Sequence, residues 1–256
     1  MSQEHDLATA PHRIPSSVRH RIPDIVPHRL RLRLSAWHPG RARRWRKLPG
    51  IQRVERSNAV LTFDDGPAPD ATPAVLGALD DAQVKATFFV LGSAVLEEPY
   101  LAREIVDRGH EIALHGFHHL RHDQMTPAQA REDIEAGLDA IEQTSQRCPR
   151  WFRPPYGRMS EPSQRACREL GLGVAYWSAW GLDWEDVSAQ AIVAEVRSGL
   201  SAGSIVLLHD TAHYGRRASA LSTVRAIAPI VDHGQRQGLT WRTLTDAHEA
   251  RDKSNA

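Results

Sequence analysis

The fold of this chain is decided at Leu61-Thr62-Phe63-Asp64-Asp65-Gly66-Pro67. The apolar run at 59–63 predicts a short buried strand, and the Gly-Pro pair predicts the loop that follows it. Two adjacent carboxylates at a strand end repel each other, so a positive partner should lie beside them. A divalent metal is the commonest such partner. Taken alone, the stretch is also compatible with an ordinary turn.

The composition is that of a globular protein with an unusual distribution of charge. The chain has 256 residues, 41% hydrophobic and 25% charged, which suits one large domain or two small ones. Residues 1–56 hold 13 of the 32 basic and 4 of the 31 acidic side chains, a net charge of +9, and the remainder carries 19 against 27, a net charge of −8. Cys148 and Cys167 have no metal-ligand spacing and predict no disulfide framework.

The N-terminal segment differs from the rest of the chain. It contains RLRLRL at 29–34 and RARRWRK at 41–47. Such runs are typical of an arm on an anionic membrane surface, and we expect no specific nucleic acid. The alternative that we favour is a solvated leader that lies over the acidic domain, and a buried edge strand is a third option. The chain shows no 18-residue apolar run and no apolar signal core, so we expect a cytoplasmic protein that the arm could bring to a membrane surface.

The pattern becomes regular from residue 57. Seven apolar, β-rich runs predict strands at 59–63, 86–91, 111–114, 150–152, 173–177, 204–208 and 239–243. Helical stretches lie between them, and Thr72-Pro73 and Thr126-Pro127 resemble an N-cap followed by proline at the first helical position. Alternating strands and helices predict an α/β protein with parallel strands, and seven such units favour a barrel over an open sheet. We therefore expect an arm at 1–56, a catalytic domain at 57–247 and a tail at 248–256.

Ionisable side chains follow five of the seven predicted strands. In a parallel barrel the chemistry lies where strands end and loops begin. The side chains at or just past these ends are Asp64 and Asp65, His115, Arg153, Asp183, and His209 with Asp210. Each of these residues alone could be an ordinary surface or core residue with no catalytic role. Their recurrence at strand ends nevertheless predicts one shared site.

The spacing of two histidines predicts a metal centre. His115 and His119 are four residues apart, so on a helical turn both imidazoles could bind one ion. His118 is the competing ligand, and a solvated histidine cluster is the alternative. Two histidines with one carboxylate are typical of a hydrolytic metal centre. One acid of the Asp64-Asp65 pair would then bind the metal while the other takes a proton from the metal-bound water.

The remaining strand-end residues suit supporting roles. Arg153 begins the stiff segment RPPYG at 153–157 and could anchor the basic carboxylate in its ionised form. His209 could protonate a leaving amine, and Asp183 could orient it. The alternatives are a core histidine hydrogen-bonded to the backbone and a loop acid beside Trp184.

Residues 57–247 resemble the polysaccharide deacetylase family, the carbohydrate esterase family 4 domain. The first motif is TFDDGP at 62–67, the third is RPPYG at 153–157, and the fifth spans 205–209. The second motif, His-(Ser/Thr)-x-x-His, departs from the pattern at Gly116 and at Leu120, where the family has proline. The loss of a hydroxyl at Gly116 should remove a hydrogen bond that stabilises the loop, and no ligand. The fourth motif matches only at Asp183-Trp184, because Trp180 stands where the family often has aspartate.

The resemblance implies a distorted (β/α)7-type barrel and a role for each matched residue. Asp64 is implied as the general base tethered by Arg153, and His209 as the general acid with Asp183 as its partner. The implied ligands of a divalent ion, zinc or alternatively cobalt, nickel or manganese, are Asp65, His115 and His119. The backbone N–H of Tyr156 would face the oxyanion, and Leu207 would line the acetyl pocket.

The implied reaction is metal-dependent removal of acetyl groups from N-acetylated sugars. Aromatic rings suit the apolar faces of sugars, so we expect Tyr156, Trp180 and Trp184 at the substrate mouth, with the two tryptophans in a loop. One alternative is a hydrolase of a non-sugar amide or cyclic imide on the same fold. Another is a non-catalytic carbohydrate-binding protein.

Overall fold

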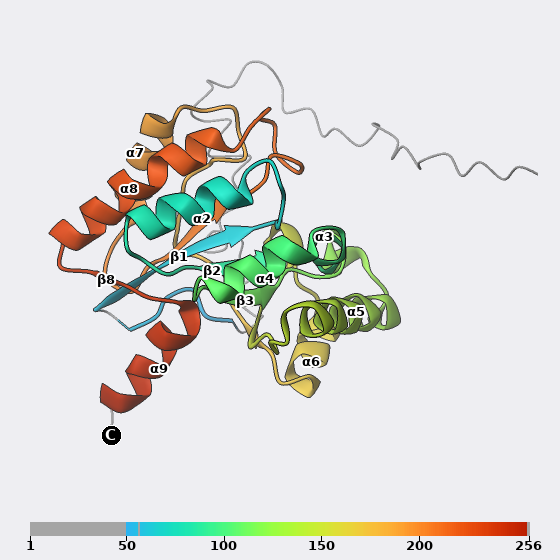
Figure 1. Ribbon diagram of the computed structural model, residues 1–256. Coiled ribbons are helices and arrows are strands. Elements are labelled where there is room, and N and C mark those ends of the chain that lie inside the picture. The colour runs from blue at the N-terminus through green and yellow to red at the C-terminus, as the bar shows by residue number, and fades with distance from the viewer. Residues whose placement is uncertain (1–49, 56, 255–256) are drawn as a thin grey trace, which may run out of the picture. The chain divides into compact units, whose positions relative to one another are not determined.

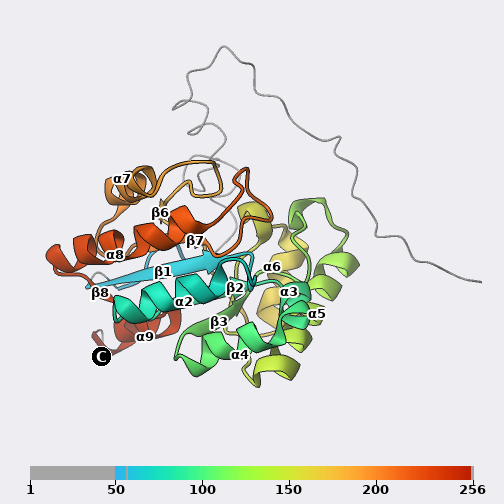
Figure 2. The ribbon, with the colours of Figure 1, turned by 45° about the horizontal axis from the view of Figure 1, so that its top comes forward.

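A computed structural model describes residues 50–55 and 57–254 (Figures 1 and 2). Most of the predicted basic arm, residues 1–49, lies outside these residues, and so does any contact it makes with a membrane. The described strands are β1 Asn58–Asp64, β2 Thr87–Val90, β3 Glu111–Leu114, β4 Trp151–Phe152, β5 Gly173–Val174, β6 Ala179–Trp180, β7 Ile205–His209 and β8 Thr240–Trp241. Every ladder between them is parallel, as predicted for an α/β protein.

The strands form a single curled sheet in the order β5-β4-β3-β2-β1-β7-β6. β8 pairs with Asn58 and Ala59 at the start of β1, and β2 takes over as the neighbour from Thr62 onward. Within residues 50–55 and 57–254, no ladder joins β5 to β6, so the barrel is incomplete. The prediction of a distorted barrel is confirmed.

The segment before the predicted boundary at residue 57 also pairs with the sheet. Ile51 bridges Ala175 just after β5, and Arg53 bridges Ser204 just before β7. These residues therefore connect the two sides of the opening in the barrel. The boundary itself stays a prediction.

The helices pack outside the sheet. They are α2 Thr72–Asp81, α3 Gly92–Glu97, α4 Pro99–Asp107, α5 Pro127–Ser145, α6 Glu161–Glu169, α7 Ala189–Gly199, α8 Leu221–Arg236 and α9 Leu244–Ser254, with short 3-10 turns at His122–Gln124 and Pro155–Gly157. Helix α8 contacts both α7 and α2 on one flank, and α5 contacts α3 and α6 on another (Figure 2). In the described part of the chain, no helix combines the length and the apolar character needed to span a bilayer.

The two predicted helix starts differ in outcome. The capping box of Thr126 and Gln129 is confirmed at the start of α5. Thr72 is not an N-cap, since Ala71 holds that position and Thr72 is the first helical residue. Its hydroxyl instead accepts the N–H of Ala68, in the loop after β1, and donates to the carboxylate of Asp210, directly after β7 Ile205–His209.

The hydrophobic core lies between the sheet and the helices that cover it. All seven residues of β1 are buried, because β1 lies in the middle of the sheet. Phe63 and Phe88 stack across the β1–β2 ladder with ring centroids 5.2 Å apart. Burial of such a side chain contributes about 1.5–3 kcal/mol, so this central pair fixes β1, whose end carries the paired aspartates.

Candidate metal centre and active site

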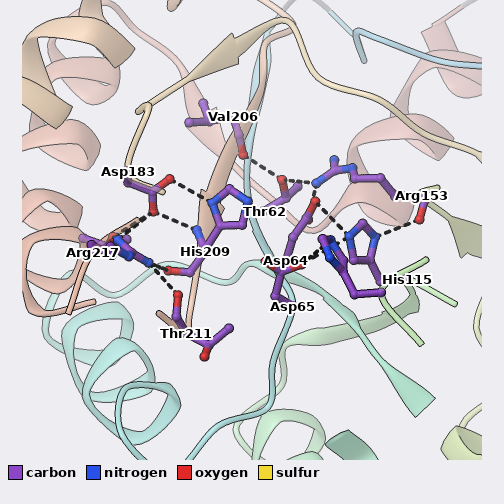
Figure 3. A network of polar contacts seen from close by, with 12 residues as sticks. Thr62, Asp64, Asp65, His115, Arg153, Asp183, Val206, His209, Thr211 and Arg217 are labelled. Carbon is purple, nitrogen blue, oxygen red and sulfur yellow. Dashed lines mark hydrogen bonds and ion pairs between the residues drawn. The ribbon is translucent and has the colours of Figure 1, made fainter. Parts of the chain in front are cut away.

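The strand register places the predicted proton acceptor, Asp64, beside the predicted proton donor, His209. Asp64 is the register partner of His209 on β7, and Thr62 is the partner of Leu207. Alternate side chains of a strand share a face, so these four side chains lie on one face of the sheet. In Figure 3 the paired aspartates lie between His209 on one side and Arg153 on the other.

Three side chains could hold one metal ion. One ligand atom from each of Asp65, His115 and His119 lies within 4.8 Å of the others. Oδ1 of Asp65 is 3.3 Å from Nε2 of His115 and 3.2 Å from Nε2 of His119. Among the described residues, this Oδ1 is a buried acceptor without a hydrogen-bond partner. His118, the competing ligand, is exposed and its ring contacts Phe117 instead.

The protonation states suit a divalent cation. Nδ1 of His115 is hydrogen-bonded to the carbonyl oxygen of Arg153 at 2.8 Å, which places the proton on Nδ1 and leaves Nε2 free to ligate. Burial lowers the pKa of His119 to about 4, so its imidazole is neutral. Burial by itself raises the pKa of Asp65, but His119 and His115 outweigh it and hold the pKa below its usual range. An anionic carboxylate and two neutral imidazoles are the states that a metal ion requires.

Arg153 holds Asp64 in one orientation. The guanidinium is fully buried and donates to Oδ1 of Asp64 at 2.6 Å and to the hydroxyl of Thr62 at 2.8 Å. It also donates to the carbonyl oxygens of Ala175 and Tyr176. Oδ2 of Asp64 is left facing the metal ligands, 3.8 Å from Nε2 of His115. The geometry therefore gives Arg153 the tethering contact that the sequence predicts.

A second buried network holds His209. Its Nδ1 lies 2.9 Å from Oδ1 of Asp183, and its backbone N–H donates to Oδ2 of the same carboxylate. Thr223 and Arg217 also donate to Oδ2. Burial by itself lowers the pKa of His209, but Asp183, followed by Asp65 and Asp64, raises it to about 9. The imidazole is therefore protonated at neutral pH.

The predicted aromatic residues separate into two groups. Tyr156 is half exposed with its ring 4.3 Å from that of His119, and Trp184 meets the ring of His209 edge-on at 5.5 Å. Trp180 lies in β6 and not in a loop, and its indole N–H donates to Glu195 of α7, so its polar edge is directed to a helix. Leu207 is buried on β7, on the face of Asp64.

Several residues near the site were missed by sequence reasoning. Arg217 and Thr223 support Asp183, and the half-exposed ring of Tyr214 lies 4.2 Å from His119. Asp210 accepts the N–H of Gly66, and a Cβ at residue 66 would lie 2.2 Å from its Oδ2. Arg217 and Tyr214 lie in no periodic or motif-bearing stretch, and Thr223 is one of the buried residues of helix α8, where nothing in the local sequence indicates its contact with Asp183. Asp210 was visible as the acid that follows His209 at the strand end, but no role was predicted for it.

Comparisons with known proteins agree with this geometry. A family model described as polysaccharide deacetylase matches residues 52–175. A chitooligosaccharide deacetylase of Bradyrhizobium sp. (strain ANU 289) is 35% identical over 195 residues, covering 73% of this chain and 89% of that protein.

Solved structures share the fold. A peptidoglycan N-acetylglucosamine deacetylase in complex with 4-naphthalen-1-yl-N-oxidanyl-benzamide superposes with a TM-score of 0.73 at 28% identity, over 77% of this chain and 92% of that one. A CE4 family pseudoenzyme from Bacillus anthracis superposes with a TM-score of 0.71 at 24% identity, over 78% of this chain and 69% of that one. Motifs, fold and relatives agree, and this chain belongs to the polysaccharide deacetylase family, carbohydrate esterase family 4.

Proposed function

We propose that this protein is a metal-dependent hydrolase that removes acetyl groups from N-acetylated sugars. The observation that carries the proposal is the convergence of Asp65, His115 and His119 between a tethered carboxylate that can accept a proton, Asp64, and a protonated imidazole that can donate one, His209. The fold alone would not suffice, because a pseudoenzyme shares it. The donor set matters more, since two imidazoles and one carboxylate are typical of hydrolytic zinc sites.

Each residue around the donor set has a task that its contacts support. A zinc ion held by Asp65, His115 and His119 would supply a Lewis acid at the acetamide carbonyl. Asp64, with Oδ1 bonded to Arg153, offers Oδ2 to accept a proton from the attacking water. The backbone N–H of Tyr156 would help to hold the developing oxyanion, a contribution on the order of 3 kcal/mol for one donor.

The departing amine needs a proton. Nδ1 of His209 is engaged by Asp183, so Nε2 is the nitrogen that can donate to the leaving nitrogen. The high pKa keeps that proton in place at neutral pH. Cleavage of the amide C–N bond then yields acetate and the free amino sugar.

The substrate proposed is an N-acetylglucosamine-type oligosaccharide, polysaccharide or glycoconjugate. The half-exposed rings of Tyr156 and Tyr214 and the indole of Trp184 lie around the metal ligands and His209, where they could cover the apolar faces of sugar rings. The named relatives act on chitooligosaccharide and on peptidoglycan N-acetylglucosamine. Both substrates contain N-acetylated sugar units, which supports this substrate class.

Acetate release from N-acetylglucosamine oligomers tests the proposal. We expect the zinc-loaded wild type and the control Asp232→Asn, an exposed acid on α8, to release acetate, and Asp64→Asn to lose at least 100-fold in rate. Chelation should abolish release, and zinc, cobalt, nickel and manganese added back separately would identify the metal. Equal release by wild type and Asp64→Asn contradicts the proposal. Hydrolysis of cyclic imides alone, or sugar binding without hydrolysis, would support the two alternative functions.

A further inference from the structure

The loop between the two candidate histidine ligands lacks the side chain that the family motif supplies. Gly116 stands where the motif has serine or threonine, and its φ of +94° is a conformation that favours glycine. A Cβ at this position would lie 2.6 Å from Oδ2 of Asp133. The space of the missing side chain is thus occupied by a carboxylate that projects from α5.

This carboxylate binds the loop backbone directly. Oδ2 of Asp133 accepts the N–H of Phe117 at 3.0 Å, and Oδ1 accepts the N–H of His118 at 3.1 Å. These are two of the three residues that separate His115 from His119. Both oxygens of the carboxylate are therefore engaged by the loop backbone, and Asp133 is only 8% exposed, so little water competes for these hydrogen bonds.

Asp133 is itself held from the far side by a fully buried histidine. Nε2 of His122 is hydrogen-bonded to Oδ2 of Asp133 at 3.2 Å, and Nδ1 is hydrogen-bonded to the hydroxyl of Ser163 on α6 at 3.1 Å. The ring of His122 also packs on Phe152 of β4, with ring centroids 5.2 Å apart. The carboxylate therefore cannot turn away from the loop without breaking its hydrogen bond to His122, which Ser163 of α6 holds in place.

The opposite edge of the loop is held as well. The carbonyl oxygens of Gly116 and Phe117 accept the N–H groups of Gly92 and Ser93 at the start of α3. The N–H groups of the loop thus point to Asp133 while its carbonyl groups point to α3. A loop held on both edges has one conformation, and that conformation fixes the separation of the two imidazoles that flank it.

We propose that Asp133 and His122 are positioning residues for the metal centre, taking over the loop-holding role of the hydroxyl that Gly116 lacks. Neither residue contacts a ligand atom of Asp65, His115 or His119, so their effect is transmitted through the loop backbone. The inference rests on the proposed metal binding. Mutation of residues that orient the metal ligands without binding the metal typically lowers metal affinity by 10- to 100-fold.

Metal affinity of the full-length protein tests this inference. Asp133→Asn keeps the shape of the side chain but replaces one acceptor oxygen by a donor, so one N–H of the loop or of His122 loses its partner. We expect zinc affinity, measured by competition with a chromophoric chelator, to fall by about 10- to 100-fold. The absorption spectrum of the cobalt-substituted protein should change shape, because it reports the ligand geometry. Asp139→Asn, an exposed acid on the same helix, is the matched control and should keep both properties.

A second variant keeps the test decisive if Asp133→Asn does not fold. His122→Phe retains a ring against Phe152 but removes both hydrogen bonds, and we expect a smaller loss of zinc affinity with the same direction of spectral change. Wild-type zinc affinity and an unchanged cobalt spectrum in either folded variant overturn the inference while leaving the proposed function intact. A wild-type protein that binds no metal overturns both.

Discussion

The ion pair between His209 and Asp183 should make the stability of the metal-free protein depend on pH. Burial alone lowers the pKa of His209, but Asp183 at 2.9 Å dominates and raises it from 6.5 to about 9. Below pH 6.5 the imidazole is protonated in both the folded and the unfolded chain, and the pair stabilises the fold fully. As the pH rises toward 9, only the folded state still binds the proton, and this stabilisation is lost.

The size of the effect follows from the two pKa values. One pKa unit corresponds to about 1.36 kcal/mol, so the rise from 6.5 to about 9 is worth roughly 3 kcal/mol. About 2 kcal/mol of this is lost between pH 7 and pH 9. A typical domain has a free energy of unfolding of roughly 5–15 kcal/mol, so the change is large enough to measure. Burial raises the pKa of Asp210 to about 7, so Asp210 also changes the free energy of unfolding between pH 7 and pH 9. This change is the same in all the variants compared and does not affect the difference between their slopes.

Urea unfolding of chelator-treated protein at pH 7, 8 and 9 provides the assay. We expect the free energy of unfolding to fall by about 2 kcal/mol across this window in the wild type. The control Asp232→Asn, which removes an exposed acid on α8, should show the same slope. Asp183→Asn should be less stable at pH 7 but nearly flat, because the charge that retains the proton is gone. Parallel slopes for wild type and Asp183→Asn would refute the reasoning.

Three further substitutions test other contacts of the site. Arg153→Met leaves the carboxylate of Asp64 buried without its cation, so we expect urea unfolding to show a loss of about 3–5 kcal/mol; a loss below 1 kcal/mol contradicts the tether. Tyr214→Ala removes a half-exposed ring beside His119 and should raise KM for sugar oligomers roughly threefold to tenfold while kcat changes little; unchanged KM in acetate-release kinetics rules out the contact. Gly66→Ala forces a Cβ against Asp210 and should lower stability by about 1–3 kcal/mol in thermal unfolding; an unchanged midpoint would show that the loop yields freely.

The main elements of the site could be predicted because parallel strands share one edge. Asp64 and His209 are far apart in sequence, yet β1 and β7 are neighbours in register and bring them together. Strands β1 and β7 are both largely apolar runs of at least four residues followed by a polar side chain. Sequence patterns detect such strands well. His115 and His119 are the pair that lies beside Asp65, but the helical turn expected for them is wrong, because residues 115–121 form a loop between β3 and the 3-10 turn at His122–Gln124, with Gly116 at a φ of +94°.

The parts that could not be predicted depend on contacts across the fold. Strand β6 has two residues, too few for any periodic pattern, so Trp180 was expected in a loop. Arg217 and Tyr214 lie in the irregular stretch after β7, where nothing in the local sequence indicates that Asp183 or His119 is near. Asp133 looks like any other acid on an amphipathic helix until its contact with the loop at Gly116 is known.

Arg153 contacts both the proposed proton acceptor, Asp64, and a proposed metal ligand, His115, but through different atoms. Its guanidinium orients Asp64, whereas its carbonyl oxygen sets the tautomer of His115. A side-chain substitution removes the first contact and spares the second, because the carbonyl belongs to the backbone that follows β4. Base orientation and metal affinity should therefore be separable at this one residue, and Arg153→Met should lose far more in kcat than in affinity for zinc. If both fell together, the side chain would be holding the backbone of the loop as well, and the tether and the ligand could not be treated as independent.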